Sequence, residues 1–146
     1  MTREIKFRGE KIYSGHWVEG YVYHDQKFRD GVSCCDVFFI RDECDEDFEV
    51  KELTIGQFTG LEDIKGKEIY EGDVVEIETY SYEEPENSYK GIVHIGVYGF
   101  AVLGEDAMGT EGYYNLLEIE GSYTTKIEVV GNIYENPELL EGESND

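Results

Sequence analysis

The sequence predicts an all-β or nearly all-β protein, in which an N-terminal β-hairpin segment precedes a small β-barrel. Three observations support this fold class. Apolar residues alternate with polar ones instead of recurring at helical spacing. Seventeen glycines divide the chain into short pieces typical of strands and turns. From Gly72 onward, five short strands are expected within about sixty residues, a number that suits a small closed barrel.

The N-terminal segment, residues 1–58, is expected to be built on hairpins. Arg3–His24 contains two alternating stretches joined by a glycine-bounded loop, the pattern of a β-hairpin. Asp36–Arg41 predicts a short strand, with Asp47–Glu52 as its possible partner and the acidic residues between them as a loop. Leu53–Phe58 is ambiguous between a helical turn and an irregular crossing.

Residues 59–146 are expected to form the second domain, which begins with the stretch TGLEDIKGKEIYEGDVVEI. Asp63–Gly66 has the composition of a tight turn in which Gly66 takes a positive φ. Around Gly72 a second turn is expected, where the Asp73 carboxylate accepts a backbone N–H. The following strand should direct Val75 and Ile77 to one face and its glutamates to the other.

The remaining strands of the barrel follow from the same alternation. After a polar loop around Pro85, strands are expected at 91–97, Phe100–Leu103, 117–119 and 127–129. Asn136-Pro137 places a helix-capping residue before a proline at the first helical position, which predicts one helical turn near the C-terminus.

The net charge of −22 argues against several partners. Residues 1–30 hold six basic and five acidic residues, a net charge of +1, so the remaining chain carries −23. A field of that sign repels phosphate, and we therefore expect no nucleic-acid partner and no anionic membrane surface. The simpler interpretation is a solvated acidic surface. The more specific one is that the near-neutral N-terminal segment docks on the acidic remainder of a chain, its own or that of another copy.

No apolar run approaches the roughly 20 residues that span a bilayer, and the N-terminus lacks a signal-peptide pattern, so a cytoplasmic location is expected. Three cysteines without CxxC spacing, Cys34, Cys35 and Cys44, suit reduced thiols. Because neighbouring strand residues point to opposite faces, Cys34 and Cys35 are not expected to bridge. We expect semi-buried structural cysteines, with a metal or redox role as the alternative.

Three stretches of the chain resemble the YopX family of bacteriophage and prophage proteins. They are FRGEKIYSGHWVEGYV, TGLEDIKGKEIYEGDVVEI and VVGNIYENPELL, which together extend from near Arg3 to Leu140. The resemblance implies a phage or prophage origin, hence a bacterial host cytoplasm, and a C-terminal half similar to the Src-homology-3-type barrel roll. It implies no catalytic residues, because the family carries no established activity.

No recognised catalytic, cofactor or metal motif is present, so no enzyme activity and no cofactor are expected. The acidic cluster at 42–47 lacks the glycine and spacing of a calcium loop, and a solvated loop is favoured. His16, His24 and His94 lack zinc-site spacing. Neither a nucleophile elbow nor a phosphate-binding glycine loop occurs, and a cysteine–histidine dyad remains only a formal alternative.

Aromatic residues are the best candidates for an interaction surface. Nine of the twelve tyrosines lie between Tyr70 and Tyr134, and tyrosine covers apolar surface while its hydroxyl stays hydrated. Core and cross-strand packing accounts for most of them. The candidate interaction residues are Trp17, Tyr80, Tyr82, Tyr89, Tyr113 and Tyr114.

Three functional hypotheses follow. The first is a non-enzymatic protein-interaction or assembly module with an unknown protein partner, which includes a possible homo-oligomer through the N-terminal hairpin. The second is an acidic mimic of nucleic acid that inhibits a DNA-processing protein of the host. The third is an enzyme of unrecognised class.

Overall fold

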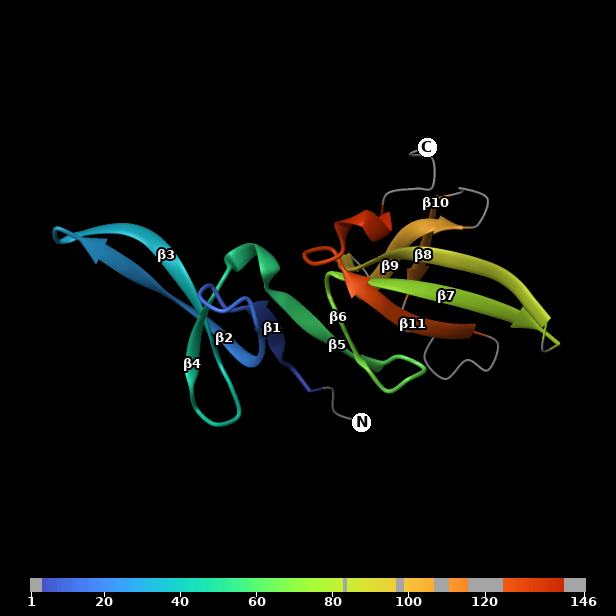
Figure 1. Ribbon diagram of the computed structural model, residues 1–146, viewed down its shortest axis with the longest axis horizontal. Helices are drawn as coiled ribbons and strands as arrows, with labels where there is room; N and C mark the ends of the chain where they lie inside the picture. The colour runs from blue at the N-terminus through green and yellow to red at the C-terminus, as the bar shows by residue number, and fades with distance from the viewer. Residues whose placement is uncertain (1–3, 83, 97–98, 107–110, 116–124, 141–146) are drawn as a thin grey trace. The chain divides into compact units, whose positions relative to one another are not determined.

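The computed structural model describes residues 4–82, 84–96, 99–106, 111–115 and 125–140 (Figure 1). The predicted β class is confirmed: the described residues form two antiparallel sheets and two short 3₁₀ turns, without an α-helix. The chain divides into two compact units, Met1–Phe58 and Thr59–Asp146.

The first sheet has the strand order β4-β3-β2-β1-β5-β6. Antiparallel register joins β1 to both β2 and β5, and β3 to both β2 and β4. The ambiguous stretch Leu53–Phe58 contains the end of a 3₁₀ turn and the beginning of a strand. The bounds are β1 (Phe7–Glu10), β2 (Trp17–Arg29), β3 (Val32–Arg41), β4 (Asp47–Val50), η1 (Glu52–Thr54), β5 (Gly56–Glu62) and β6 (Glu68–Tyr70).

The predicted N-terminal hairpin is present as β1–β2, but its second strand is longer than expected. β2 continues to Arg29, and β3 begins at Val32 instead of Asp36. The two strands are joined by Asp30-Gly31, both at positive φ (54° and 77°). Positive φ at both central residues is the geometry of a type I′ turn, for which Asp-Gly is a preferred sequence. The Asp-Gly dipeptide could therefore have predicted this second hairpin from sequence.

A small apolar core stabilises the first unit. Val18, Ile40 and Val50 are buried together, with half-buried aromatic and aliphatic side chains around them. Gly9 lies against this core, and a Cβ there would be 3.1 Å from both Ile40 Cδ1 and Val50 Cβ. The glycine therefore permits β1 to pack closely on the core.

The second sheet has the order β10-β9-β8-β7-β11 (Figure 1). One face carries the core, in which Val75, Ile77, Val93, Val102 and Ile127 are buried together with Ile69 of β6. Val75 and Ile77 are buried and Glu78 is exposed, as the alternation predicted, but Glu76 is half-buried and Val74 is fully buried, so the opposite face of β7 is only partly solvated. The bounds are β7 (Asp73–Ser81), β8 (Glu84–Gly96), β9 (Gly99–Asp106), β10 (Glu111–Asn115), β11 (Thr125–Asn132) and η2 (Pro137–Leu140).

The closed barrel predicted for the second half is wrong. Within the described residues, β10 pairs with β9 and β11 pairs with β7, so the sheet is open between these two edges. Closure requires a particular stagger and tilt between the edge strands, and counting strands determines neither. The polar stretch around Pro85 is also mostly strand, because β8 begins at Glu84 and pairs along the length of β7. The strand expected at 117–119 lies outside the described residues.

The local turn chemistry is confirmed. Gly66 has φ +83° and Gly72 has φ +93°. Asp73 is buried, and its Oδ2 accepts a hydrogen bond from the Tyr70 N–H at 2.8 Å. The predicted C-terminal turn is present as η2, with Pro137 at its first position.

Two turns, one in each unit, share the same construction. Asp42 Oδ1 accepts the N–H groups of Cys44 and Glu46 at 2.9 and 3.0 Å. Asp63 Oδ1 accepts those of Lys65 and Lys67 at 2.9 and 2.8 Å. The fourth residue is left-handed in both turns, Asp45 at φ +59° in the first and Gly66 in the second. The acidic stretch at 42–47 therefore contains an aspartate-stabilised turn.

Asp45 occupies a backbone conformation that glycine adopts without steric cost. We expect Asp45→Gly to leave the fold unchanged and to raise the free energy of unfolding by about 0.5 kcal/mol, since an L residue is disfavoured in the left-handed region. Chemical denaturation of both proteins measures this difference. Asp45→Val serves as the opposite control, because a β-branched residue is strongly disfavoured at positive φ; equal stability of the two variants would contradict the expectation.

Candidate interaction surface

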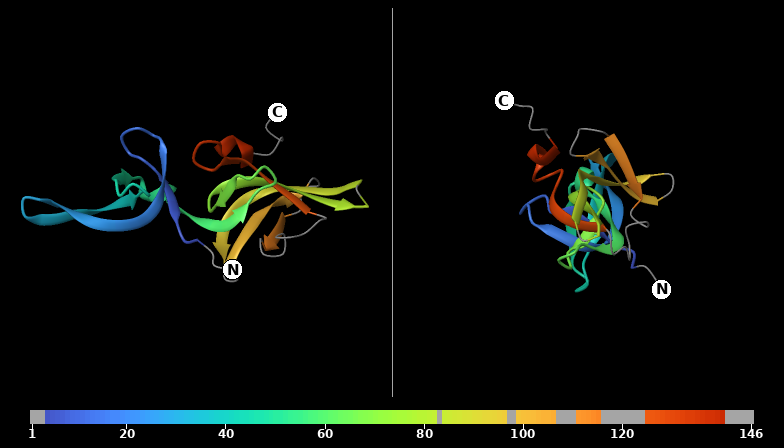
Figure 2. Two further views of the ribbon diagram at one scale, coloured as in Figure 1. Left: turned by 90° about the horizontal axis from the view of Figure 1, so that it is seen from below. Right: turned by 90° about the vertical axis from the view of Figure 1, so that its right-hand side faces the viewer.

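β2 and β3 form a two-stranded ribbon that extends beyond their neighbouring strands (Figures 1 and 2). On one side, β1 pairs with β2 only over Trp17–Gly20. On the other, β4 pairs with β3 only over Phe38–Arg41. Beyond these points, among the described residues, β2 and β3 pair only with each other. Each strand of the ribbon therefore has one edge whose backbone groups lack a strand partner.

Aromatic cross-strand pairs occupy the base of the ribbon. Tyr23 and Phe39 stack with ring centroids 5.3 Å apart and planes 16° apart, and His24 lies 5.7 Å from Phe38. Toward the tip, large apolar side chains are exposed, with Phe28 at 66% and Val32 at 68% exposure. A two-stranded hairpin is at best marginally stable in water, and exposed apolar residues on such a ribbon form a surface that another chain can cover.

An ion pair orients the base of the ribbon. Arg41 Nε donates to Asp47 Oδ1 at 2.8 Å, and the Arg41 guanidinium lies 5.6 Å from the Tyr23 ring centroid. The hydrogen bond from Arg41 lowers the pKa of Asp47. The pKa of Tyr23 is raised, mainly by partial burial and secondly by its hydrogen bond with Asp47. All three groups keep their ordinary charge states at neutral pH.

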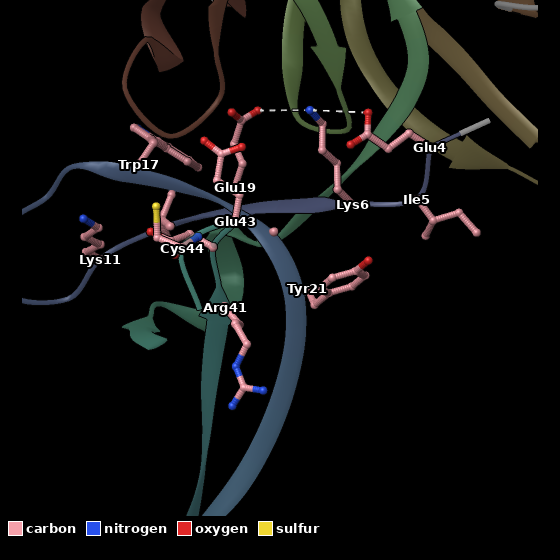
Figure 3. A pocket seen from close by; sticks show the side chains of 13 residues that line it. Glu4, Ile5, Lys6, Lys11, Trp17, Glu19, Tyr21, Arg41, Glu43 and Cys44 are labelled. Carbon is pink, nitrogen blue, oxygen red and sulfur yellow. Dashed lines mark hydrogen bonds and ion pairs between the residues drawn. The ribbon is translucent and has the colours of Figure 1, made fainter. Parts of the chain in front are cut away.

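A cavity of about 830 Å³ opens beside the start of β2 (Figure 3). Trp17, Glu19 and Tyr21 line it from alternate positions of β2, as expected for residues on one face of a strand. Lys6 Nζ lies 3.9 Å from Glu4 Oε2 and 4.0 Å from Glu19 Oε2, while the Arg41 side chain points away from this group (Figure 3). The remaining lining residues are Ile5, Lys11, Val18, Gly20, Asp42, Glu43 and Cys44.

The cavity wall depends on a close approach of β2 to β3. A Cβ on Gly20 would lie 1.9 Å from the Arg41 carbonyl oxygen, so no side chain fits there. The Arg8 guanidinium lies 5.0 Å from the centroid of the Trp17 ring. The lining combines the aromatic side chains of Trp17 and Tyr21 with charged side chains of both signs.

The candidate tyrosines of the second unit do not share one environment. Tyr80 donates to Glu78 Oε2 at 2.5 Å, a hydrogen bond that raises the pKa of Tyr80, and Lys126 Nζ lies 4.7 Å from its ring. Tyr82 is 99% exposed at φ +50°. Tyr89 is half-buried against the core. An aromatic groove that unites them stays a prediction.

Tyr113 and Tyr114 lie on β10, opposite Leu103 and Val102 of β9. Their side chains are outside the described part of the structure. Of the six candidate residues, Trp17 is the one that lines the large cavity.

The cysteine prediction is wrong in two respects, the directions of the Cys34 and Cys35 side chains and the burial of the cysteines. The pairing of β2 with β3 shifts between Lys27 and Phe28, which pair with Cys35 and Ser33, so Cys34 is the extra residue of a β-bulge. A bulge redirects side chains, and the Cys34 and Cys35 Sγ atoms lie 3.4 Å apart instead of on opposite faces. All three cysteines are exposed instead of semi-buried, and none of them is disulfide-bonded.

Within the described ranges, no three or more His, Cys, Asp or Glu side chains gather to hold a metal ion. None of the helical turns in that same part of the chain has the length and apolar character needed to cross a bilayer.

Comparison with known proteins gives a family and a structural neighbour. Residues 6–141 match the family described as YopX protein. The crystal structure of protein EF1440 from Enterococcus faecalis is similar, with 24% sequence identity and a TM-score of 0.47, over 96% of this chain and 100% of that one. Among curated proteins, none matches the chain.

Proposed function

The chain belongs to the YopX family, and we propose that it is a non-enzymatic protein-interaction or assembly module that acts through the β2–β3 ribbon. The observation that carries this proposal is the unpaired edge of β2 beyond Gly20, next to exposed apolar side chains. Edge strands of this length are templates for strand addition by another chain.

The partner that we propose is a second copy of the chain. Two copies at −22 repel each other, so self-association should use the least acidic surface. Tyr21–Asp36 holds three acidic and two basic residues, a net charge of only −1. The ribbon therefore brings two copies together with little charge repulsion between the contacting strands.

The sequence of β2 is self-complementary in one antiparallel register. Pairing about Gln26 places Asp25 opposite Lys27 of the second copy. Opposite charges directly across two strands are favourable, and a two-fold axis forms the pair twice. Lys27 Nζ lies 3.3 Å from Glu49 Oε1 in its own chain, a half-exposed contact that is worth little and can be exchanged.

A charge swap tests this register. Asp25→Lys and Lys27→Asp each place like charges opposite each other, and each should weaken dimerisation at least about tenfold. The double variant restores opposite charges and should recover most of the affinity. Size-exclusion chromatography with light scattering and analytical ultracentrifugation measure the dissociation constants.

Two results would count against the proposal. Equal weakening by the single and double variants would exclude pairing about Gln26. A strictly monomeric protein that also captures no partner from host lysate would leave the interaction module without support. Since the family is one of phage and prophage proteins by the resemblance described above, the bacterial host cytoplasm is the proposed site of action and the source of that lysate.

Inhibition by nucleic-acid mimicry is the second candidate function. Glu76, Glu78 and Glu128 border a small cavity of about 100 Å³ on the second unit, and the chain is strongly acidic overall. Carboxylates of this kind can occupy a basic groove of a DNA-processing enzyme. Such binding should weaken steeply with added salt, and salt-insensitive binding would argue against mimicry.

The Src-homology-3-type arrangement of the second unit stays a prediction. An experimental structure of residues 59–146, compared with such rolls strand by strand, would test it.

A further inference from the structure

The bulge in β3 creates a feature that the proposed interaction does not use. It places the Sγ atoms of two adjacent cysteines 3.4 Å apart on an exposed part of the ribbon. The self-association described above uses the edge of β2, whereas both thiols belong to β3. A chemical role for this pair is therefore independent of dimerisation.

We propose that Cys34 and Cys35 form a redox-active dithiol that exchanges with small-molecule disulfides of the glutathione type. When two thiols are in contact, the second thiol can attack the mixed disulfide formed by the first without having to diffuse to it, so the two react in sequence on one protein. Both side chains are exposed, so a dissolved disulfide can reach them.

The reaction has two steps. The thiolate of one cysteine attacks a sulfur of the small disulfide, forms a mixed disulfide and releases one small thiolate. The second cysteine, as its thiolate, attacks the protein sulfur of that mixed disulfide, forms the Cys34–Cys35 bond and releases the second small thiolate. The two protons lost from the protein thiols end on the two small thiols. The protein is oxidised by two electrons and the small disulfide is reduced by two.

The product is expected to be easily reversed. Consecutive Cα atoms are about 3.8 Å apart across a trans peptide, shorter than the roughly 4.4–6.8 Å of ordinary disulfides. A bond between neighbours is consequently strained, and strained disulfides are more readily reduced. The pair thus suits a reversible switch better than a structural cross-link.

Cys44 provides an internal control. It is exposed in the β3–β4 turn, and trypsin separates it from the pair, because cleavage after Arg29, Arg41 and Lys51 gives the peptides Asp30–Arg41 and Asp42–Lys51. The reduced protein is treated with oxidised glutathione, quenched by alkylation, digested and analysed by mass spectrometry.

The expected result is different chemistry in the two peptides. Asp30–Arg41 should lose two hydrogens and carry no glutathione, whereas Asp42–Lys51 should accumulate a glutathione adduct. In Cys34→Ser, the remaining Cys35 should retain a stable adduct because the resolving thiol is missing. Stable adducts on both cysteines of the wild-type pair, a disulfide between two chains, or no reaction at the pair would each overturn the proposal.

Phenylarsine oxide supplies a second measurement, since this trivalent arsenical is chelated by two thiols. Cys44→Ser should bind one equivalent, and Cys34→Ser/Cys44→Ser should bind at least about tenfold more weakly, because the chelate loses one arm. Equal affinity of the two variants would refute the dithiol. Circular dichroism checks that both variants are folded, and the result does not depend on whether the protein is a monomer or a dimer.

Discussion

Gly104→Ala is expected to destabilise the second unit by more than about 3 kcal/mol. A Cβ on Gly104 would lie 1.9 Å from the Lys90 carbonyl oxygen and 2.5 Å from the Gly91 Cα. Gly104 pairs with Gly91, where a Cβ would lie 2.2 Å from the Leu103 carbonyl oxygen. All of these obstacles are backbone atoms, so no side-chain rotation can relieve the overlap.

The two backbones must separate to accept even one methyl group. Overpacking against side chains costs roughly 1–3 kcal/mol, and displacing a central strand pair should cost more, out of a total stability of roughly 5–15 kcal/mol for a domain. Urea denaturation followed by circular dichroism measures the loss. Gly66→Asn is the control: it changes a glycine with nothing within 4 Å of its missing Cβ, and should cost about 1 kcal/mol or less. Similar stability losses in both variants would show that the close approach of β8 and β9 is not required.

Asp63→Ala is expected to cost about 3 kcal/mol, considerably more than Asp42→Ala. Both aspartates accept two N–H groups within their own turn. Only Asp63 also accepts a distant one, from Val129 of β11 at 3.0 Å, and it is buried at 7% exposure. Hydrogen bonds to a charged acceptor contribute about 1.5–3 kcal/mol, and a buried donor left without one is costly.

Asp42→Ala measures the value of the local turn alone, for which about 1 kcal/mol is expected. The difference between the two variants therefore isolates the bond to β11. Thermal and urea unfolding of both proteins at pH 7 give the two values. If Asp42→Ala were as damaging as Asp63→Ala, the long-range bond would contribute nothing.

Acidic pH should reduce the effect of Asp63→Ala. Burial raises the pKa of Asp63, but the backbone N–H groups of Val129, Lys67 and Lys65 outweigh it, and the pKa lies below the ordinary 3.8. A carboxyl group whose pKa is lowered by folding contributes stability above its unfolded pKa and loses that contribution as pH falls through the folded pKa. The stability difference between wild type and Asp63→Ala should consequently be constant above about pH 5 and shrink below pH 4.

Local chemistry was predictable from sequence because it depends on a few neighbouring residues. Gly66, Gly72 and Asp73 were assigned their turn roles correctly, since positive φ and a nearby carboxylate are properties of a short stretch. The second acceptor role of Asp63 was not predictable, because its donor is 66 residues away.

The errors of the sequence-based view arise from strand register. Whether β10 meets β11 is a relation between distant segments, and alternation within each strand does not determine it. The bulge at Cys34 is a mismatch in length between β2 and β3, and it reverses the inference drawn from simple alternation. The Asp30-Gly31 turn could have predicted the ribbon. The strands on either side of it were missed because their polar residues interrupt the apolar alternation.

The ribbon has a consequence for how the protein fluctuates. Its outer part lies beyond the strands that flank its base, while Val75 and Val93 of the second sheet are fully buried. Its backbone amides should therefore exchange their hydrogens with solvent quickly through local opening, whereas the amides of the buried core should exchange slowly. Binding or oxidation at the ribbon should therefore change its conformation locally, while the structure of the two cores stays the same.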